Sequence, residues 1–373
     1  MARLERLAPL ARRARRARML RTLLPLLGLA LVAIAHAAEP DEAKALYDHG
    51  LYRKSAAECE KRLAANPKDA TAGALLSRIR AMQGDKSAAM KLAEAAAAAD
   101  AKSAEAQFAL AQAYGREARE ASVLRQPGLA GKMKKACEAA LAIEPNHVDA
   151  LDLASDFYRF APGIMGGDKK KSVEYVDRMV KLDPVEGWIK RAEVASDDKD
   201  TVRAAECYRK AHEADPASAR AAVQLGSWLA PSYRDPAMSE KLALAAIQAE
   251  PWRSGGWQLL AVLYAYQERW PELEDVLKRS EAAEPSHLSP WYQAGRQLIV
   301  SGKDPARAEA YLRHYLSREP EIGASSWAAA RWRLGQALEK QGKKSEAVSE
   351  LETAVKLDPK LTDAKKDLKR LRG

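Results

Sequence analysis

Apolar side chains recur every three or four residues through most of the chain, which is the spacing of one face of an α-helix. No convincing run of alternating β-branched residues interrupts this pattern, so strands are not expected. Prolines return at the ends of the apolar segments, mostly after an acidic residue, and their shortest steps are 32, 34 and 35 residues. They are Pro67, Pro145, Pro184, Pro216, Pro251, Pro285, Pro320 and Pro359. A repeat near 34 residues predicts an array of helical hairpins rather than one globular core.

The clearest unit runs from Arg331 to Pro359. Its small residues Gly335 and Ala347 stand where two helices would pack closely, and Gly342 would break the chain between them. Proline then ends the second helix, because it lacks an N–H donor and its ring clashes with the preceding turn. Each hairpin buries its apolar face against its neighbours, so three or more are needed for stability.

This unit resembles the tetratricopeptide repeat, whose pattern is Trp–Leu–Gly–Tyr–Ala–Phe–Ala–Pro at set spacings. The matching residues are Leu334, Gly335, Leu338, Ala347, Leu351, Ala354 and Pro359. The resemblance covers about residues 41–360 and implies an all-α, right-handed superhelix of about nine hairpins. Residues 361–373, which are rich in lysine and arginine, are expected to form a capping helix with a polar outer face.

The first 37 residues have the composition of a secretory signal. Eight arginines lie in the first 21 positions, 13 mostly apolar residues follow from Leu23 to Ala35, and Ala35-His36-Ala37 supplies a cleavage pattern. This apolar run is shorter than the roughly 20 residues that span a bilayer. We expect a cleaved Sec-type leader and a periplasmic or secreted array from residue 38 to 360. An uncleaved anchor and a start at Met19 are the alternatives.

The leader also changes the meaning of the net charge. The whole chain carries +10, with an isoelectric point near 9.3, which alone would suggest a nucleic-acid partner. Without the first 37 residues, 53 basic and 50 acidic side chains remain, a net charge of +3. We therefore expect no nucleic-acid partner, and no membrane span after removal of the leader.

The three cysteines and six histidines form no catalytic or metal-binding pattern. Cys59 and Cys137 fall at the core position of second helices two repeats apart, roughly 20 Å if packed helices are 8–10 Å apart. A disulfide needs Cα atoms within about 7 Å, so none is expected. His147 and His287 share one turn position, two residues after a proline, and no histidine lies in a metal-ligand motif. We expect no metal, no cofactor and no enzyme activity.

Two insertions interrupt the repeat. Residues 161–171, Ala-Pro-Gly-Ile-Met-Gly-Gly-Asp-Lys-Lys-Lys, add five residues to the fourth hairpin. Because Asp168 stands where a P-loop needs its second glycine, we expect an enlarged turn capped by Asp168, not a phosphate cradle. A similar Pro-Gly-x-x-Gly-Gly-Asp-Lys loop occurs in exported bacterial tetratricopeptide proteins. Ten residues near 126–131 are expected to lengthen the connection in the third hairpin.

The aromatic residues are unevenly distributed, since all eight tryptophans lie between Trp188 and Trp332. Trp257 and Trp291 occupy the repeat's own tryptophan position and are expected in the core. The resemblance implies that first helices line a concave groove with their second, fifth, ninth, twelfth and thirteenth positions. Carried onto this chain, those positions give a basic and aromatic set in the later repeats and an acidic set in the fourth repeat. They are Arg191, Arg220, Tyr266, Tyr292, Arg296 and Trp332, and Asp149, Asp152 and Asp156.

Tyrosine, tryptophan and arginine are the side chains that dominate binding hot spots, although solvated faces and partial core burial would also account for this set. The paired asparagines with which chaperone-binding arrays clamp a terminal carboxylate are absent, because the chain has only Asn66 and Asn146. The sequence therefore predicts a non-catalytic periplasmic scaffold that binds a protein or peptide in its groove, in cell-envelope assembly. A glycan or small-ligand binding module is the alternative.

Overall fold

The computed structural model describes residues 41–230 and 235–373, and within these ranges the chain forms helices and no strand. The predicted leader and the expected mature N-terminus at Ala38 lie outside the described residues. The helices are α2 (Glu42–Asp48), α3 (Tyr52–Ala65), α4 (Ala70–Met82), α5 (Lys86–Ala99), α6 (Ala104–Glu120), α7 (Gln126–Ile143), α8 (Val148–Phe160), η1 (Gly163–Met165), α9 (Lys169–Leu182), α10 (Pro184–Asp197), α11 (Thr201–Ala214), α12 (Ala219–Leu229), α13 (Pro236–Ala249), α14 (Ser254–Gln267), α15 (Trp270–Ala283), α16 (Ser289–Ser301), α17 (Pro305–Tyr315), α18 (Trp327–Lys340), α19 (Lys344–Leu357) and α20 (Thr362–Arg372).

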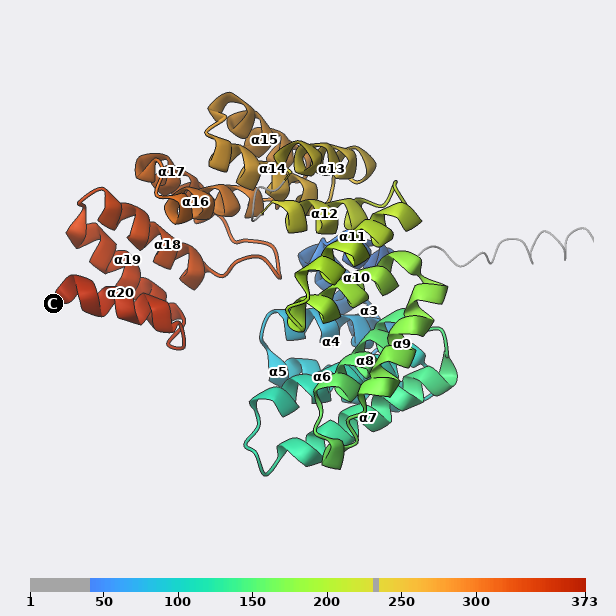
Figure 1. Ribbon diagram of the computed structural model, residues 1–373. Coiled ribbons are helices and arrows are strands. Elements are labelled where there is room, and N and C mark those ends of the chain that lie inside the picture. Colours follow the sequence, from blue (N-terminus) through green and yellow to red (C-terminus); the bar gives the residue numbers. More distant parts are fainter. Residues whose placement is uncertain (1–40, 231–234) are drawn as a thin grey trace, which may run out of the picture.

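Consecutive helices pair into nine hairpins, from α2 with α3 to α18 with α19, and α20 packs on α19 at the C-terminal end (Figure 1). First helices of successive hairpins contact one another, as α4 does α6 and α14 does α16. Across the described chain, second helices make no appreciable contact with other second helices, so they fan out on the outer side. The first helices therefore line the concave side of a superhelix, and the predicted all-α fold is confirmed.

The periodic prolines lie where one hairpin ends and the next begins. At the α9–α10 junction, Asp183 ends one helix and its carboxylate accepts a hydrogen bond from the Glu186 N–H at 3.1 Å. Pro184 then occupies the first position of α10, where a missing N–H donor costs nothing. At this junction, proline thus prevents α9 from continuing and begins α10.

The two predicted insertions behave differently. Residues 161–171 form the expected enlarged turn: Asp168 accepts hydrogen bonds from the N–H groups of Lys170 (2.9 Å) and Lys171 (3.3 Å) and so caps α9. The residues near 126–131, however, are not themselves part of a longer connection, so the predicted lengthening is found only in small part. They form the first turns of α7, because Pro127 is tolerated in a first helical turn, and the connection is limited to residues 121–125.

A third insertion lies before Trp327, between α17 and α18, and its contacts with the first hairpins were not predicted from the sequence. Residues 319–325 lie between α17 and α18, and we call this segment the strap. Figure 1 shows this connection reaching from the late hairpins toward α3 and α4. Ile322 is buried in one cluster with Ala56, Cys59 and Ile79 of the first two hairpins. The backbone N–H of Arg53 donates to the Glu321 carboxylate at 3.0 Å.

Further contacts close the superhelix at the same place. The Arg53 guanidinium donates to the Pro320 carbonyl at 3.1 and 2.7 Å. The Lys54 ammonium lies 3.1 Å from a carboxylate oxygen of Glu284, which lies between α15 and α16. The first hairpin therefore touches the seventh and eighth, and the array returns on itself after about one superhelical turn.

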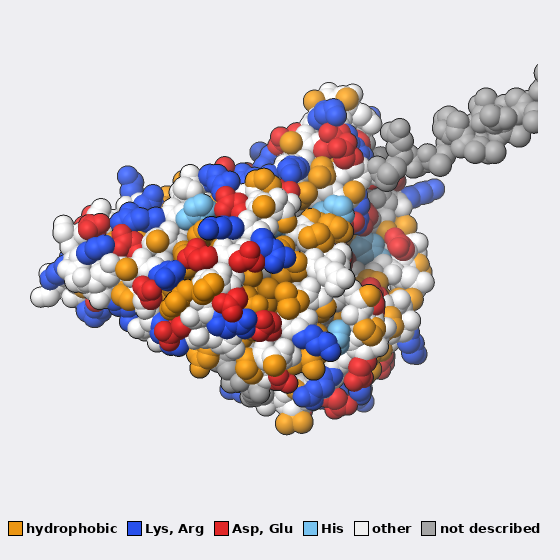
Figure 2. Space-filling model, turned by 90° about the horizontal axis from the view of Figure 1, so that it is seen from above, with side chains coloured by type: hydrophobic (Ala, Val, Ile, Leu, Met, Phe, Trp, Pro, Cys, Tyr) orange, Lys and Arg blue, Asp and Glu red, His pale blue; other side chains and the backbone are white. Residues whose placement is uncertain are grey.

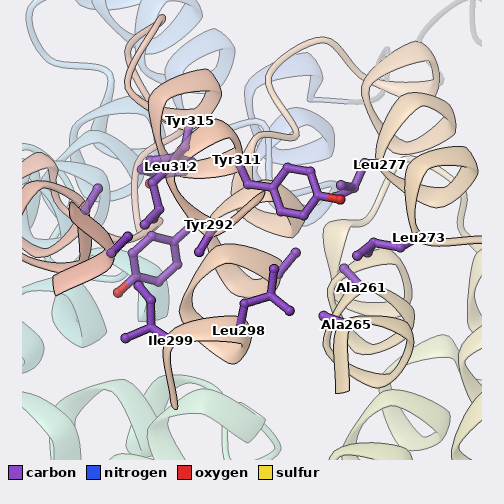
Figure 3. Close-up of a cluster of buried hydrophobic side chains, with 14 of the residues drawn as sticks. Ala261, Ala265, Leu273, Leu277, Tyr292, Leu298, Ile299, Tyr311, Leu312 and Tyr315 are labelled. Carbon is purple, nitrogen blue, oxygen red and sulfur yellow. The ribbon is translucent and has the colours of Figure 1, made fainter. Parts of the chain in front are cut away.

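The core is continuous in the late hairpins and divided in the early ones. One cluster of buried side chains extends from Ala230 to Leu371, and Figure 3 shows part of it between α14 and α17. The earlier hairpins have several smaller clusters. All three cysteines are buried and free, and burial raises the pKa of Cys59 to about 11 and that of Cys137 to about 12. Such thiols act as small apolar core residues.

Candidate binding groove

The acidic residues predicted in the fourth repeat do come together on the concave side. Asp149, Asp152 and Asp156 lie on α8, and two cations that were not selected from the sequence neutralise part of their charge. Lys190 of α10 is buried and lies 2.7 Å from Asp152 and 2.6 Å from Asp156. Arg78 of α4 lies 2.8 Å from Asp149. Lys190 follows Asp156 by 34 residues, one repeat, and this spacing was the available signal for the pair.

Asp149 and Asp152 line a hollow of about 120 Å³. Two further carboxylates, Glu186 and Glu193 of α10, line it as well. Burial raises the pKa of Glu186, Glu193 and Asp152, and the neighbouring cations Arg220 and Lys190 oppose this effect. Burial disfavours the charged form of a carboxyl group, whereas a nearby cation favours it. Carboxylates outnumber cations here, so the middle of the groove is acidic.

The two predicted groove arginines of the middle hairpins occupy different places. Arg191 forms an ion pair with Asp177 of α9, and its guanidinium lies 4.8 Å from the centre of the Trp188 ring. It therefore belongs to the interface between two hairpins. Arg220 of α12 remains half exposed beside the acidic hollow and forms an ion pair with Glu186.

The three predicted groove aromatics of the late hairpins are largely used in packing. Tyr292 is only 7% exposed, and its ring centre lies 5.3 Å from that of Tyr315, so it belongs to the core, as Figure 3 shows. Trp332 donates its indole N–H to Asp367 of α20 at 2.8 Å and so holds the capping helix. Tyr266 is half-buried, with the Lys303 ammonium 5.0 Å from its ring centre. The repeat position alone did not reveal that α17 and α20 would cover these side chains.

Among the predicted groove residues of the late hairpins, Arg296 of α16 remains exposed. Its side chain is exposed and forms no ion pair or hydrogen bond with the residues that the structure describes. Nearby on the concave side is a hollow of about 500 Å³, which we call the late groove. It is lined by Ile299, Val300, Arg333, Gln336, Glu339, Lys340 and Arg370.

The late groove combines an exposed apolar side chain with excess positive charge. Val300 is 61% exposed. Glu339 is already paired with Arg370 at 2.8 Å. Among the described residues, Arg333 contacts only neutral or aromatic groups and donates to Gln336 at 2.9 Å. Val300 and Lys340 were not among the predicted groove residues, although both occupy the thirteenth repeat position.

The surface in Figure 2 carries acidic and basic side chains interspersed with apolar ones, without a large area of one sign. Within residues 41–230 and 235–373, no helix is both long enough and apolar enough to cross a bilayer. The same ranges contain no group of three or more histidine, cysteine, aspartate or glutamate side chains arranged to hold a metal ion.

Comparison with known proteins gives matches of two kinds. Residues 328–361 match the tetratricopeptide repeat family, while no curated protein matches the chain. Among solved structures, a tetratricopeptide repeat protein of Parabacteroides merdae is 15% identical, with 70% of this chain and 100% of that chain covered and a TM-score of 0.46. Yeast Tom70 is 13% identical, with 89% and 87% covered and a TM-score of 0.48. A thermophilic tetratricopeptide repeat protein of Thermus thermophilus is 18% identical, with 50% and 98% covered and a TM-score of 0.40.

The matched segment comprises α18 and α19, the unit in which the repeat pattern was clearest from the sequence. The other hairpins stack on it in the same way, with first helices inside and second helices outside. Residues 328–361 therefore form a tetratricopeptide repeat, and the described chain has the all-helical superhelical fold of a tetratricopeptide repeat protein.

Proposed function

We propose that this protein is a non-catalytic scaffold that captures a segment of a partner protein in the late groove. The observation that carries the proposal is the open hollow in which exposed Val300 lies among side chains with uncompensated positive charge. A concave surface made by first helices accepts an extended segment or a helix, which apolar contacts bind and charges orient.

The chemistry of the late groove favours one kind of partner segment. Arg296 and Lys340 are exposed and have no acidic partner among the described residues. An acidic segment would place carboxylates near these cations and an aliphatic or aromatic side chain against Val300. The acidic middle of the groove would repel the same segment and so favour binding in the late hairpins.

Site-specific crosslinking tests this assignment. A photo-crosslinking amino acid replaces Val300 in one variant and Val202 in a control, because Val202 is also exposed but lies on α11 at the outer side. We expect a discrete protein adduct from Val300 only, and Arg296→Glu should abolish it. Equal adducts from both positions, or an adduct unaffected by charge reversal, would remove the support for the late groove.

We also propose that the array works in the periplasm, in assembly of the cell envelope. The arginine-rich leader with its short apolar run and Ala35-His36-Ala37 supports export. Sequencing the N-terminus of protein recovered from a periplasmic fraction should give Ala38 or a residue close to it. Recovery of the intact leader in cytoplasmic or membrane fractions would contradict the proposal.

A further inference from the structure

Two turns on one edge of the array expose large apolar side chains to solvent. Each turn joins the first helix of a hairpin to the second: residues 121–125 connect α6 with α7, and residues 161–168 connect α8 with α9. Leu124 in the first turn is 94% exposed, and Ile164 in the second is 99% exposed. Two neighbouring apolar side chains are also exposed: Val123 and Phe160. Neither Leu124 nor Ile164 therefore contributes to the core.

The corresponding turns of other hairpins have a different composition. They contain only polar residues and glycine at 83–85, 198–200 and 302–304. A turn between two helices therefore does not need an apolar residue at its tip. Apolar side chains that gather at one exposed place often mark a contact surface. The insertion at 161–168 also has no role in the late groove, with which it shares no residue.

The two turns belong to one surface. Figure 1 shows both at the lower end of the molecule, beside α7. The short helix η1 in the second turn contacts α7. The ammonium groups of Lys134 on α7 and Lys171 on α9 lie 5.6 and 5.3 Å from the centre of one ring, that of Tyr158. The apolar tips and these cations therefore share one edge, which we call the basic edge and define as residues 116–135 and 160–171.

The basic edge carries a positive charge that the rest of the array lacks. It contains nine basic and three acidic side chains, a net charge of +6. The remaining residues of 38–373 contain 44 basic and 47 acidic side chains, a net charge of −3. The positive net charge of the array as a whole therefore comes from this edge.

The three carboxylates of the basic edge are already engaged. Glu117 forms an ion pair with Arg125 at 2.7 Å, and Glu120 forms one with Lys86. Asp168 caps α9. The cations are therefore in excess, and two exposed lysines at the start of α9 form no ion pair with the residues that the structure describes. These are Lys169 and Lys170.

We propose that the basic edge binds the surface of a membrane that contains anionic phospholipids. The exposed lysines contact lipid phosphates, and Leu124 and Ile164 enter the boundary between headgroups and acyl chains. A bilayer accepts separate apolar tips, whereas a protein interface buries its anchors in packed pockets and is depleted in lysine. This docking leaves the late groove free and does not depend on the function proposed for it.

Co-sedimentation with vesicles tests the proposal. The vesicles are made of phosphatidylcholine, with and without phosphatidylglycerol as a third of the lipid. The chain from residue 38 is used, because the first 37 residues carry eight arginines and would bind such vesicles themselves. We expect binding at least about tenfold tighter to the phosphatidylglycerol vesicles, and weaker binding at high salt. No binding, or equal binding to both kinds of vesicle, would overturn the proposal.

Replacing the apolar tips tests their insertion. Leu124→Ser combined with Ile164→Ser should weaken binding to the phosphatidylglycerol vesicles at least about tenfold, because less apolar area enters the bilayer. The melting temperature should not change, since both side chains are exposed. Val300→Ser combined with Leu357→Ser is the control, because these exposed side chains lie on late hairpins. Unchanged binding in the first variant contradicts the proposal.

Reversing charges tests the lysines. Lys169→Glu combined with Lys170→Glu should also weaken binding at least about tenfold. Glutamate in the first turn of α9 is compatible with the helix dipole, so the fold should be kept. Lys365→Glu combined with Lys366→Glu on α20 changes the net charge equally and should leave binding unchanged. Equal losses in both variants would show a general effect of net charge and exclude the basic edge. Loss in the first variant without loss in the serine variant would identify binding of any polyanion, such as a nucleic acid, and would also exclude membrane docking.

Discussion

The early and late hairpins of this array are built from different side chains. Between α4 and α6, one cluster consists entirely of buried alanines: Ala74, Ala93, Ala96, Ala106, Ala109 and Ala113. In the late hairpins, leucine, tyrosine and tryptophan side chains form one cluster from Ala230 to Leu371. Burying a leucine contributes about 1.5–3 kcal/mol, and an alanine buries far less apolar area. The late core is therefore much stronger than the α4–α6 cluster, although other early clusters include Phe108, Leu75 and Ile79.

This difference shows that hairpins of unequal stability can still form one closed superhelix. Stability in a repeat protein is approximately a sum of the units and their interfaces. The early hairpins have small cores, and they gain contacts from elsewhere: Ile322 of the strap from the late half, and the buried Lys190 from α10. The late hairpins supply their own core, which gives the late groove a rigid base.

The largest effect is expected in the late core. Leu334 is fully buried in the hairpin that matches the repeat family, and Leu334→Ala should cost about 2–5 kcal/mol through lost burial and a cavity. Hydrogen exchange should show lost protection in α16–α20 and little change in α2–α6. A uniform loss along the chain would show that the two halves unfold as one unit.

Ile322→Ala should transmit damage from the late half of the chain to the early half. Because Ile322 packs on the first two hairpins, its truncation should cost about 2 kcal/mol and expose amides of α3 and α4. Ile164→Ala is the control, since Ile164 is 99% exposed in the loop after α8. Unchanged exchange in α3 and α4 would mean that the strap contributes little to the early hairpins.

Removing Lys190 tests the contribution of the acidic middle. Lys190→Met leaves Asp152 and Asp156 close together without their cation, at a cost of about 1–2 kcal/mol, since both carboxylates remain partly solvated. Thermal unfolding at neutral pH measures the loss. Adding Asp152→Asn should restore part of it, and a purely additive double variant would argue against direct coupling.

A further effect should appear in acid and in the late half. Burial alone would raise the pKa of Glu309, but hydrogen bonds from Lys343, Arg313 and Gln341 lower it to about 2, below the ordinary 4.5. Its contribution to stability is therefore complete above pH 4.5 and is lost as the pH falls toward 2. Denaturant titrations should show that Glu309→Gln removes this part of the pH dependence. Parallel pH profiles for the variant and the original chain would contradict it.

The sequence predicted the hairpins well because their signals are local. Proline at the junctions and small residues such as Gly335 at the helix crossings act within one repeat. The contact of the strap with the first hairpins escaped prediction because the partners of Ile322 lie more than 200 residues away in the chain. The groove was predicted only in part. The repeat position of a residue gives the direction of its side chain but does not show which neighbouring residues contact or bury it. Tyr292 faces Tyr315 in the core, and Asp152 faces Lys190 on the neighbouring first helix.

The strap also sets an order of events during synthesis. Arg53 and Glu321 are separated by 268 residues in the chain, whereas most contacts in a solenoid join neighbouring repeats. At about 5–20 residues per second, the ribosome needs roughly 13–54 s to make the chain between them. Through that interval the first hairpin emerges with the apolar site of Ile322 uncovered. The contacts between the first hairpin and the strap therefore cannot form until most of the chain has been made.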